Sequence, residues 1–391
     1  MISGRRPFGA TLLVALLLGA GCQGRPPEPA PEPVRPRWQR LALPAPAGAP
    51  GRLLVRDVTG CAGRWYVVGG VGAGAGETRP AAWASSDGSA WAAIPLTPKS
   101  YYGRRSVLYS AACTNGRLAV LGDKPGGAHG NPRASSWQQR PDGSLVEIEA
   151  RFELYGGPTA VNVARLVAGP AGYLITGNRS SGAAAWLSPD AGEFEIMEGA
   201  PELATDARGT TWAFDATATA QGWLMVGGIL PPAGRIDRDP LAWASPDGRA
   251  WRREPVPATG EYEELQRVVV CDGTPLAVGL RGRDFGVWRR VAGGWELAGS
   301  FGARGPAGVP LVGALTVTGD GVLAAVSDGT SYTLWAGGDG GRSWRPVTGP
   351  APMPVGAGRD ASVVALADRV VLAVDDGRES TLWAARLPSG S

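Results

Sequence analysis

Seven tryptophans recur along this chain at a nearly constant interval, and this repeat limits the folds that the chain can adopt. Each follows an apolar or small residue, and successive members stand 54, 49, 57, 45, 47 and 48 residues apart. A period of about 50 residues is typical of one four-stranded blade of a β-propeller. The sequence therefore predicts seven blades across residues 51–388, marked by Trp83, Trp137, Trp186, Trp243, Trp288, Trp335 and Trp383.

A second repeated segment, a turn followed by an apolar strand that ends near glycine, precedes each tryptophan. Clear copies begin at Gly63, Gly116, Gly172 and Gly222, and weaker copies follow in the later repeats. Short apolar runs between turn residues are typical of buried strands. The 60 Gly and 34 Pro agree with many short strands and frequent turns. We expect an all-β, seven-bladed propeller with four-stranded blades.

The seventh repeat ends near Pro388, which leaves no room for a fourth strand after Trp383. Residues 38–44, WQRLALP, closely match the outer-strand segment 251–257, WRREPVP. Pairing of the N-terminal segment with the last blade would close the ring and protect two open sheet edges. We expect residues 37–44 to be the outer strand of blade 7.

Turns of the form S-x-D-G-x-x-W follow several of the tryptophan strands. The good copies are residues 85–91, 245–251 and 337–344, and partial copies surround Asp142 and Asp190. This pattern resembles the Asp-box, or BNR, repeat of sialidase-like propellers. In such a turn the aspartate accepts hydrogen bonds from turn amides, glycine takes a positive φ and the aromatic residue packs onto the blade. We expect structural roles for Asp87, Trp91, Asp142, Asp190, Asp247, Trp251, Asp339 and Trp344.

The first 36 residues are predicted to be an export signal and a tether. Arg5 and Arg6 precede an apolar run over residues 10–18 that is too short to span a bilayer. Small residues then lead into Cys22, an arrangement that resembles a bacterial lipobox and implies a signal peptide at residues 1–21 and lipidation of Cys22. Sec and twin-arginine export both stay open.

Residues 22–36 are rich in proline and are expected to be an extended tether, with the propeller at residues 37–391. The expected location is the extracytoplasmic face of the cell membrane, held by a lipid anchor, with secretion as the alternative. Without the signal peptide the chain has 36 basic and 35 acidic residues, because Arg5 and Arg6 are removed from 38. This balance does not suggest nucleic-acid binding.

Three cysteines remain once Cys22 is lipidated, so at most one disulfide can form. Cys61 and Cys113 occupy similar places in consecutive repeats and make the best pair in an oxidising compartment. Cys271 is expected to be a small buried hydrophobic residue. With a single histidine in the chain, neither a metal site nor a cofactor is predicted.

Ligands of propellers are generally found at the central channel or on the face that carries the loops between blades. Several of these loops place arginine beside aromatic residues, a combination that can hold carboxylates, phosphates or sugar rings. The candidate ligand-binding residues are Tyr101, Tyr102, Arg104, Arg105, Arg133, Tyr155, Arg179, Tyr262 and Arg283.

No residue is predicted to be catalytic, and two functions are weighed. The favoured one is a monomeric, non-catalytic scaffold that binds an envelope protein or a cell-wall polymer and contacts the membrane through its lipid anchor only. The alternative is a sialidase-like glycoside hydrolase. That resemblance implies three arginines on a substrate carboxylate and a tyrosine activated by glutamate, for which Tyr262 with Glu261 and Glu263 is available. The Arg-Ile-Pro type motif of those enzymes does not occur after residue 21.

Overall fold

The computed structural model describes Met1 and residues 31–74, 76–126, 131–232 and 234–388. The chain divides into two compact units, Met1–Pro31 and Glu32–Ser391, and the second is the propeller. Cys22 and the predicted signal peptide lie outside the described residues. None of the helices in the described part of the chain is long and apolar enough to cross a membrane.

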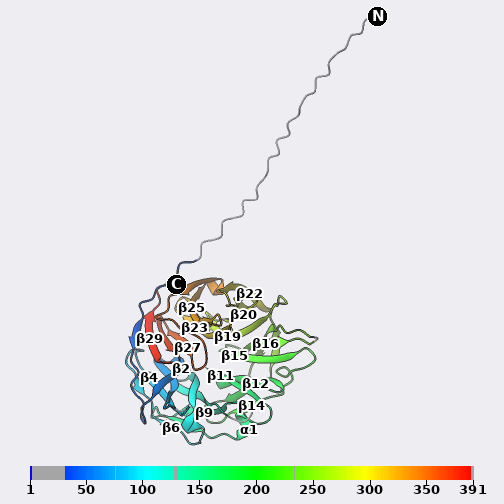
Figure 1. The fold of residues 1–391 in the computed structure, drawn as a ribbon. Helices are drawn as coiled ribbons and strands as arrows, with labels where there is room; N and C mark the ends of the chain where they lie inside the picture. Colours follow the sequence, from blue (N-terminus) through cyan, green and yellow to red (C-terminus); the bar gives the residue numbers. More distant parts are fainter. Residues whose placement is uncertain (2–30, 75, 127–130, 233, 389–391) are drawn as a thin grey trace. The chain divides into compact units, whose positions relative to one another are not determined.

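Seven antiparallel sheets follow one another around a common axis (Figure 1), which confirms the predicted seven-bladed fold. Blade 1 contains β2 (Arg52–Cys61), β3 (Arg64–Gly72), β4 (Thr78–Ser85) and β5 (Ala92–Ala93). Blade 2 contains β7 (Val107–Thr114), β8 (Arg117–Lys124), β9 (Arg133–Gln139) and β10 (Leu145–Ile148). Blade 3 contains β11 (Ala160–Gly169), β12 (Gly172–Arg179), β13 (Gly182–Ser188) and β14 (Glu195–Met197). Blade 4 contains β15 (Thr210–Thr219), β16 (Gly222–Leu230), β17 (Asp239–Ser245) and β18 (Arg252–Pro255).

The remaining blades have the same order, from an inner strand at the axis to an outer strand at the rim. Blade 5 contains β19 (Glu263–Cys271), β20 (Thr274–Arg281), β21 (Asp284–Val291) and β22 (Gly294–Phe301). Blade 6 contains β23 (Leu311–Thr318), β24 (Gly321–Ser327), β25 (Tyr332–Gly338) and β26 (Ser343–Val347). Blade 7 contains β27 (Asp360–Leu366), β28 (Arg369–Asp375), β29 (Ser380–Arg386) and β1 (Gln39–Leu41). Short elements between them are β6 (Leu96–Thr97), η1 (Gly103–Arg105), α1 (Phe152–Tyr155) and η3 (Asp339–Gly341).

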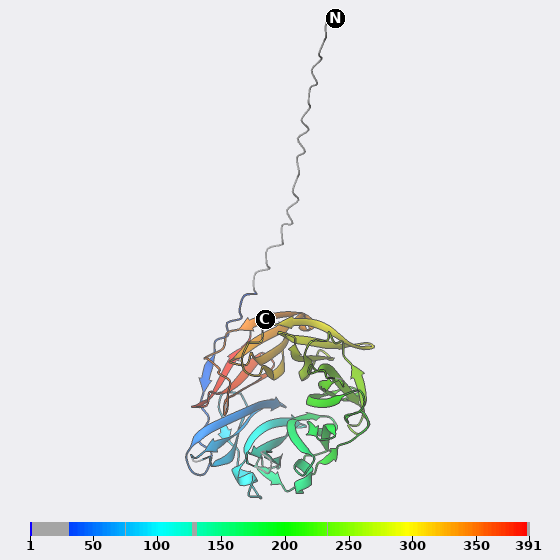
Figure 2. The same cartoon turned by 45° about the vertical axis from the view of Figure 1, so that its right-hand side comes forward.

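The N-terminal strand closes the ring, as the sequence predicts. β1 pairs antiparallel with β29, with Arg40 opposite Trp383 and Leu41 opposite Leu382. Figure 2 shows this pairing as a blue strand at the edge of the red sheet. Val34 forms a further parallel bridge with Val347 of β26, so folded structure begins before residue 37. One addition to the expected four-stranded pattern is β6, which pairs parallel with β10 in blade 2.

The apolar core is divided among the seven boundaries between blades, with one cluster of buried side chains at each. The repeated tryptophans of blades 1–5 are fully buried, whereas Trp335 and Trp383 are partly exposed. A disulfide joins Cys61 to Cys113, whose Cα atoms lie 5.8 Å apart, and links blade 1 to blade 2. Each blade is thus held mainly by its two neighbours.

Side chains near the axis also join every blade to the next through a backbone amide. Asp57 of blade 1 accepts from the Ala111 amide of blade 2 at 2.9 Å, and Ser110 of blade 2 accepts from the Leu166 amide of blade 3 at 3.0 Å. The same relation recurs around the whole ring. The remaining pairs are Asn178 with Ala213, Asp215 with Val268, Gln266 with Val312, Thr316 with Ala365 and Ser362 with Val58.

The aspartate turns have the geometry expected of structural hairpin clamps in most copies. Asp87 accepts from the Ser89 and Ala90 amides at 2.7 and 2.9 Å. Asp247, Asp142 and Asp190 likewise accept from amides of their own turns. The Asp339 turn differs, because it forms the short helix η3, in which Asp339 itself has a φ of 51°. Trp91, Trp251 and Trp344 are all buried against their blades.

Candidate functional site

A buried carboxylate shapes the loop that enters blade 2. Glu147 of β10 accepts from the Lys99 and Ser100 amides at 2.6 and 2.8 Å and from the Ser100 hydroxyl at 2.5 Å. The chain then passes so close to this carboxylate at Gly103 that a Cβ there would collide with it. The loop is therefore fixed from behind, and it presents Tyr101 and Tyr102 outward with 56% and 40% of their surfaces exposed.

A second fixed loop, which contains α1, lies between blades 2 and 3. Arg179 of β12 donates to the Gly156 carbonyl at 3.0 Å and the Thr159 hydroxyl at 2.7 Å, and its Nε bonds Glu198 at 2.7 Å. Trp186 donates its indole N–H to the Leu154 carbonyl at 2.7 Å. These bonds hold α1 so that its first residue, Phe152, stays half exposed.

Arg133, the first residue of β9, lies between these two loops. Its guanidinium carbon is 4.3 Å from the ring centre of Phe152 and 5.6 Å from that of Tyr102. Tyr102 meets Tyr101 edge to face at 5.3 Å, and Arg105 lies 4.1 Å over the Tyr101 ring. We call this set the aromatic–arginine row: Arg105, Tyr101, Tyr102, Arg133 and Phe152.

A pocket of about 270 Å³ lies beside the row. The side chains that matter for its chemistry are Tyr102, Arg133, Glu147, Phe152 and Tyr155. Among the described residues, Arg105 pairs with Glu77 at 3.1 Å, whereas Arg133 forms no ion pair and its buried Nε has no hydrogen-bond partner. The Tyr155 hydroxyl lies deeper, and burial raises the pKa of Tyr155 above its ordinary value, so it stays protonated.

The other predicted ligand-binding residues are not part of this pocket. Arg104 is exposed and donates to the Lys99 carbonyl at 2.9 Å. Arg179 is 4% exposed and is occupied by the loop contacts described above. Tyr262 and Arg283 belong to blade 5, and nothing in the described contacts joins them to the row. The structure thus brings together Tyr101, Tyr102, Arg105, Arg133 and Tyr155 from the predicted set.

Tyr262 does contact a glutamate, but the partner is Glu264 at 2.9 Å and not Glu261 or Glu263. Arg238 donates to the same Glu264 oxygen at 2.7 Å and lies 3.3 Å from the Tyr262 hydroxyl. Burial and the nearby Glu264 carboxylate raise the pKa of Tyr262 to about 12. This phenol is therefore held in its protonated form by its surroundings.

Three arginines outside the predicted set converge near the axis from the inner strands. They are Arg56, Arg165 and Arg267, each at or beside a bulge in its strand. Arg56 pairs with Asp375 at 2.7 Å, Arg165 lies 4.0 Å from Asp215, and Arg267 donates to the Gly313 carbonyl. A charged residue inside an otherwise apolar inner strand is the signal that could have located them.

The charges of this axial group largely compensate one another. Burial raises the pKa of Asp360 to about 6, while Arg56 opposes the shift. Burial, together with the neighbouring Arg165, lowers the pKa of Arg267 to about 10. Since aspartates or carbonyls already face these arginines, the group resembles an internal ion network more than a cradle for one anion.

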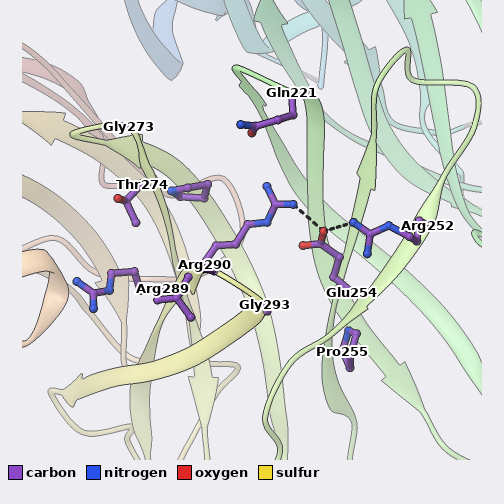
Figure 3. Close-up of a pocket in the computed structure, with 13 residues that line it drawn as sticks. Gln221, Arg252, Glu254, Pro255, Gly273, Thr274, Arg289, Arg290 and Gly293 are labelled. Carbon is purple, nitrogen blue, oxygen red and sulfur yellow. Dashed lines mark hydrogen bonds and ion pairs between the residues drawn. The ribbon is translucent and has the colours of Figure 1, made fainter.

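A larger pocket of about 740 Å³ lies between blades 4 and 5, and its arginines are also occupied (Figure 3). Arg252 and Arg290 both donate to one oxygen of the buried Glu254 at 2.7 Å. Trp295 donates to the other oxygen at 3.3 Å. Figure 3 shows Arg289 turned away from this carboxylate. Glu254 therefore joins the two blades, and the arginines of this pocket have an internal counterion.

No family model matches the sequence, and no curated protein is similar to it. Solved structures of low identity share the fold. A Mycobacterium tuberculosis puromycin-hydrolyzing peptidase aligns with a TM-score of 0.52 and 12% identity over 87% of this chain and 52% of that one. The chain thus spans about half of that protein's length.

The β-propeller domain of the Trilobed protease from Pyrococcus furiosus aligns with a TM-score of 0.50 and 10% identity, over 87% of this chain and 94% of that one. A Trypanosoma rangeli sialidase aligns with a TM-score of 0.43 and 10% identity, over 87% of this chain and 55% of that one. The likeness to the peptidase and to the Trilobed protease domain shows the propeller fold alone.

Proposed function

We propose that this protein is a non-catalytic propeller scaffold, anchored by a lipid on Cys22 at the extracytoplasmic face of the membrane, which binds a partner protein through the aromatic–arginine row. The observation that carries the proposal is the row itself. Tyrosine and arginine are enriched among the residues that dominate protein–protein binding energy. Three of the seven exposed large hydrophobic side chains of the described residues belong to the row: Tyr101, Tyr102 and Phe152.

The hydrogen bonds beneath the row favour binding, because its loops are already fixed before a partner binds. Glu147 fixes the Tyr101–Tyr102 loop, and Arg179 fixes α1. Binding surfaces that are already held in place lose less conformational entropy on association. Aromatic side chains of this size also bury a large area for few rotatable bonds.

Export to the cell envelope is supported by the N-terminal sequence and by the disulfide. Arg5, Arg6, the apolar run at residues 10–18 and Cys22 match a lipoprotein signal in outline. The Cys61–Cys113 bond suits an oxidising compartment. We infer also that the clamped turns at Asp87 and Asp247 are Asp-box repeats, because each aspartate accepts two amides of its own turn.

The geometry favours this scaffold over the glycosidase alternative. A nucleophilic tyrosine needs a glutamate that can take up its proton, and Glu264 is instead paired with Arg238 at 2.7 Å. The arginines that converge near the axis already face aspartates or carbonyls, as Arg56 faces Asp375. We therefore assign no glycosidase activity to the described residues.

Site-specific photocrosslinking in the cells that make the protein tests the proposal. A photoreactive residue placed at position 152 or position 101 should give one discrete crosslinked protein. The matched control is position 236, because Ile236 is also exposed, at 84%, but belongs to blade 4. Loss of the product on Tyr102→Ser supports the row as the contact surface. Identical products from positions 152 and 236, or none from the row, would contradict it.

A further inference from the structure

The pocket beside the row contains an arginine whose charge has no internal counterion. Among the described residues, the arginines of the large pocket and of the axis each face a carboxylate or a carbonyl, as Arg290 faces Glu254. Arg179, which holds the α1 loop, donates to the Gly156 carbonyl and to Glu198. Arg133 instead forms no ion pair with a described carboxylate, and its guanidinium lies over the rings of Phe152 and Tyr102. A guanidinium without a counterion is stabilised most by a ligand that is an anion, because its parallel N–H groups can bind two oxygens at once.

The two rings also orient the guanidinium. Phe152 and Tyr102 lie within cation–π distance of it, at 4.3 and 5.6 Å, and restrict where the planar group can turn. Arg133 is partly buried, and because its buried Nε has no hydrogen-bond partner among the described residues, the desolvation of that N–H is not compensated there. An oxyanion that accepts two parallel N–H bonds from the guanidinium edge would repay it.

A hydroxyl deeper in the pocket provides a second donor. Tyr155 lines the pocket and is 8% exposed. The nearby Ser136 hydroxyl lowers the pKa of Tyr155 somewhat against the larger effect of burial, and neither hydroxyl has a hydrogen bond of good geometry among the described residues. A buried hydroxyl with a poorly formed hydrogen bond is costly, so a ligand oxygen that reaches it would stabilise the site.

The surrounding charge selects between anions. Glu147 and Glu149 both line the pocket; Glu147 is occupied by the Lys99–Ser100 segment, and the exposed Glu149 lies 3.9 Å from the Lys99 ammonium. Both glutamates oppose a doubly charged phosphate more strongly than a singly charged carboxylate. The volume of about 270 Å³ is below the usual range for a small-molecule site and suits a single side chain.

We infer that this pocket receives the carboxylate of one Glu or Asp side chain of the partner protein, with Arg133 as the residue that binds it. The inference rests on the proposed function, since the row supplies the contact surface around the pocket. Arg133 binds the carboxylate through its guanidinium edge, Tyr155 donates from below, and the rings of Tyr102 and Phe152 exclude water from the ion pair.

A titration of the full-length protein in detergent tests the inference, with the Nε–H resonance of Arg133 followed by NMR. The probe is N-acetyl-glutamic acid 1-amide, and the neutral control is N-acetyl-glutamine amide. We expect saturable shifts with the acid, none with the amide, and at least tenfold weaker binding of inorganic phosphate. Saturation by methyl glucuronide but not by the glutamate probe would overturn the inference in favour of an acidic polysaccharide.

Variants separate this pocket from the row as a whole. Arg133→Lys keeps the positive charge but not the planar guanidinium, and it should bind the glutamate probe at least tenfold more weakly. Arg133→Gln should not bind the probe. Both affinities are read from the ring resonances of Tyr102 and Phe152. Arg140→Gln, in an exposed turn of the same blade, is the matched control and should bind normally. Equal affinity of Arg133→Gln and the unmodified protein would overturn the inference.

The photocrosslinks from positions 101 and 152 distinguish the two failures. If those products form but the unmodified protein does not bind the glutamate probe, the scaffold proposal stands and the carboxylate inference fails. If the probe binds but no row position yields a discrete product, the scaffold proposal fails, and the assignment of the carboxylate to a partner protein fails with it, whereas carboxylate binding by Arg133 stands.

Discussion

The carboxylate of Asp57 accepts a hydrogen bond from the backbone amide of Ala111 across the boundary between blades 1 and 2, at 2.9 Å. The same carboxylate also accepts from the Val58 amide and from the hydroxyl of Ser362 in blade 7. One buried side chain therefore joins three consecutive blades of the ring. Because the apolar core is divided among separate boundaries, such polar links set the spacing of the blades at the axis.

Removal of this carboxylate should be strongly destabilising. Asp57→Ala leaves the buried Ala111 amide and the Ser362 hydroxyl without this acceptor, and the Val58 amide keeps only its 3.4 Å bond to Ser362. We expect a loss of about 3–5 kcal/mol in the free energy of unfolding. Urea denaturation followed by tryptophan fluorescence measures it. Asp368→Ala is the control, because its ion pair with Arg386 is exposed and should be worth less than about 1 kcal/mol. Equal losses in the two variants would rule out a special role for Asp57.

Ring closure predicts a different sensitivity in the N-terminal strand. Leu41 is buried against the cluster between blades 7 and 1, so Leu41→Asp should cost about 3 kcal/mol or more. Gln39 lies on the same strand and is exposed, so Gln39→Asp should change stability by less than about 0.5 kcal/mol. Thermal unfolding of both variants is the measurement. A stable Leu41→Asp protein would show that β1 is dispensable for closure.

The partly buried Asp360, at the start of β27, predicts that the stability of the protein depends on pH. Because burial raises the pKa of Asp360 to about 6, the folded state binds this proton more tightly than the unfolded state does. Its contribution to stability is complete below about pH 4 and is lost as the pH rises through about 6. Asp360→Asn should therefore stabilise the protein at pH 8, by on the order of 1–3 kcal/mol, and change it little at pH 4. Denaturation curves of Asp360→Asn and the unmodified protein at pH 4 and pH 8 measure this difference. A variant that is stabilised equally at both pH values would contradict the raised pKa of Asp360 as the cause.

The disulfide between Cys61 and Cys113 should stabilise the ring by constraining the unfolded chain. For a sequence separation of 52 residues, the loop-entropy relation gives an upper value of about 4 kcal/mol. The double variant Cys61→Ala, Cys113→Ala should unfold at lower urea concentration than the oxidised protein. Reduction of the unmodified protein should reproduce that shift, whereas Cys271→Ala should not. A double variant as stable as the oxidised protein would contradict the prediction.

The architecture was predictable because each blade repeats one local pattern. Trp83 and its six counterparts mark the third strand of each blade, and the resemblance of residues 38–44 to residues 251–257 correctly indicated the closing strand. Two features lay outside that pattern. Val34 and β6 pair through backbone groups, and no side-chain signature distinguishes such pairing from a proline-rich linker or a loop.

The binding site was predictable only in part, because a propeller brings together loops from adjacent blades. Tyr102, Arg133 and Tyr155 follow one another across blades 1 to 3 and meet at one pocket. Tyr262 and Arg283 have the same residue types but belong to blade 5. Arg179 is paired with Glu198 and is therefore not available to a ligand, and the residue types alone do not indicate this pairing.

The bridge between Val34 and Val347 has a mechanical consequence. The Val34 amide donates to the Pro346 carbonyl, the Thr348 amide donates to Val34, and the Trp38 indole donates to the Thr348 carbonyl. The chain then continues into β1 on blade 7, so this segment straps the outer strands of two neighbouring sheets together. Tension applied at residue 32 would load the bonds to blade 6 before it reached β1. A force on the N-terminal side would therefore be borne by β26 of blade 6 as well as by β29 of blade 7, and would not detach the closing strand β1 alone.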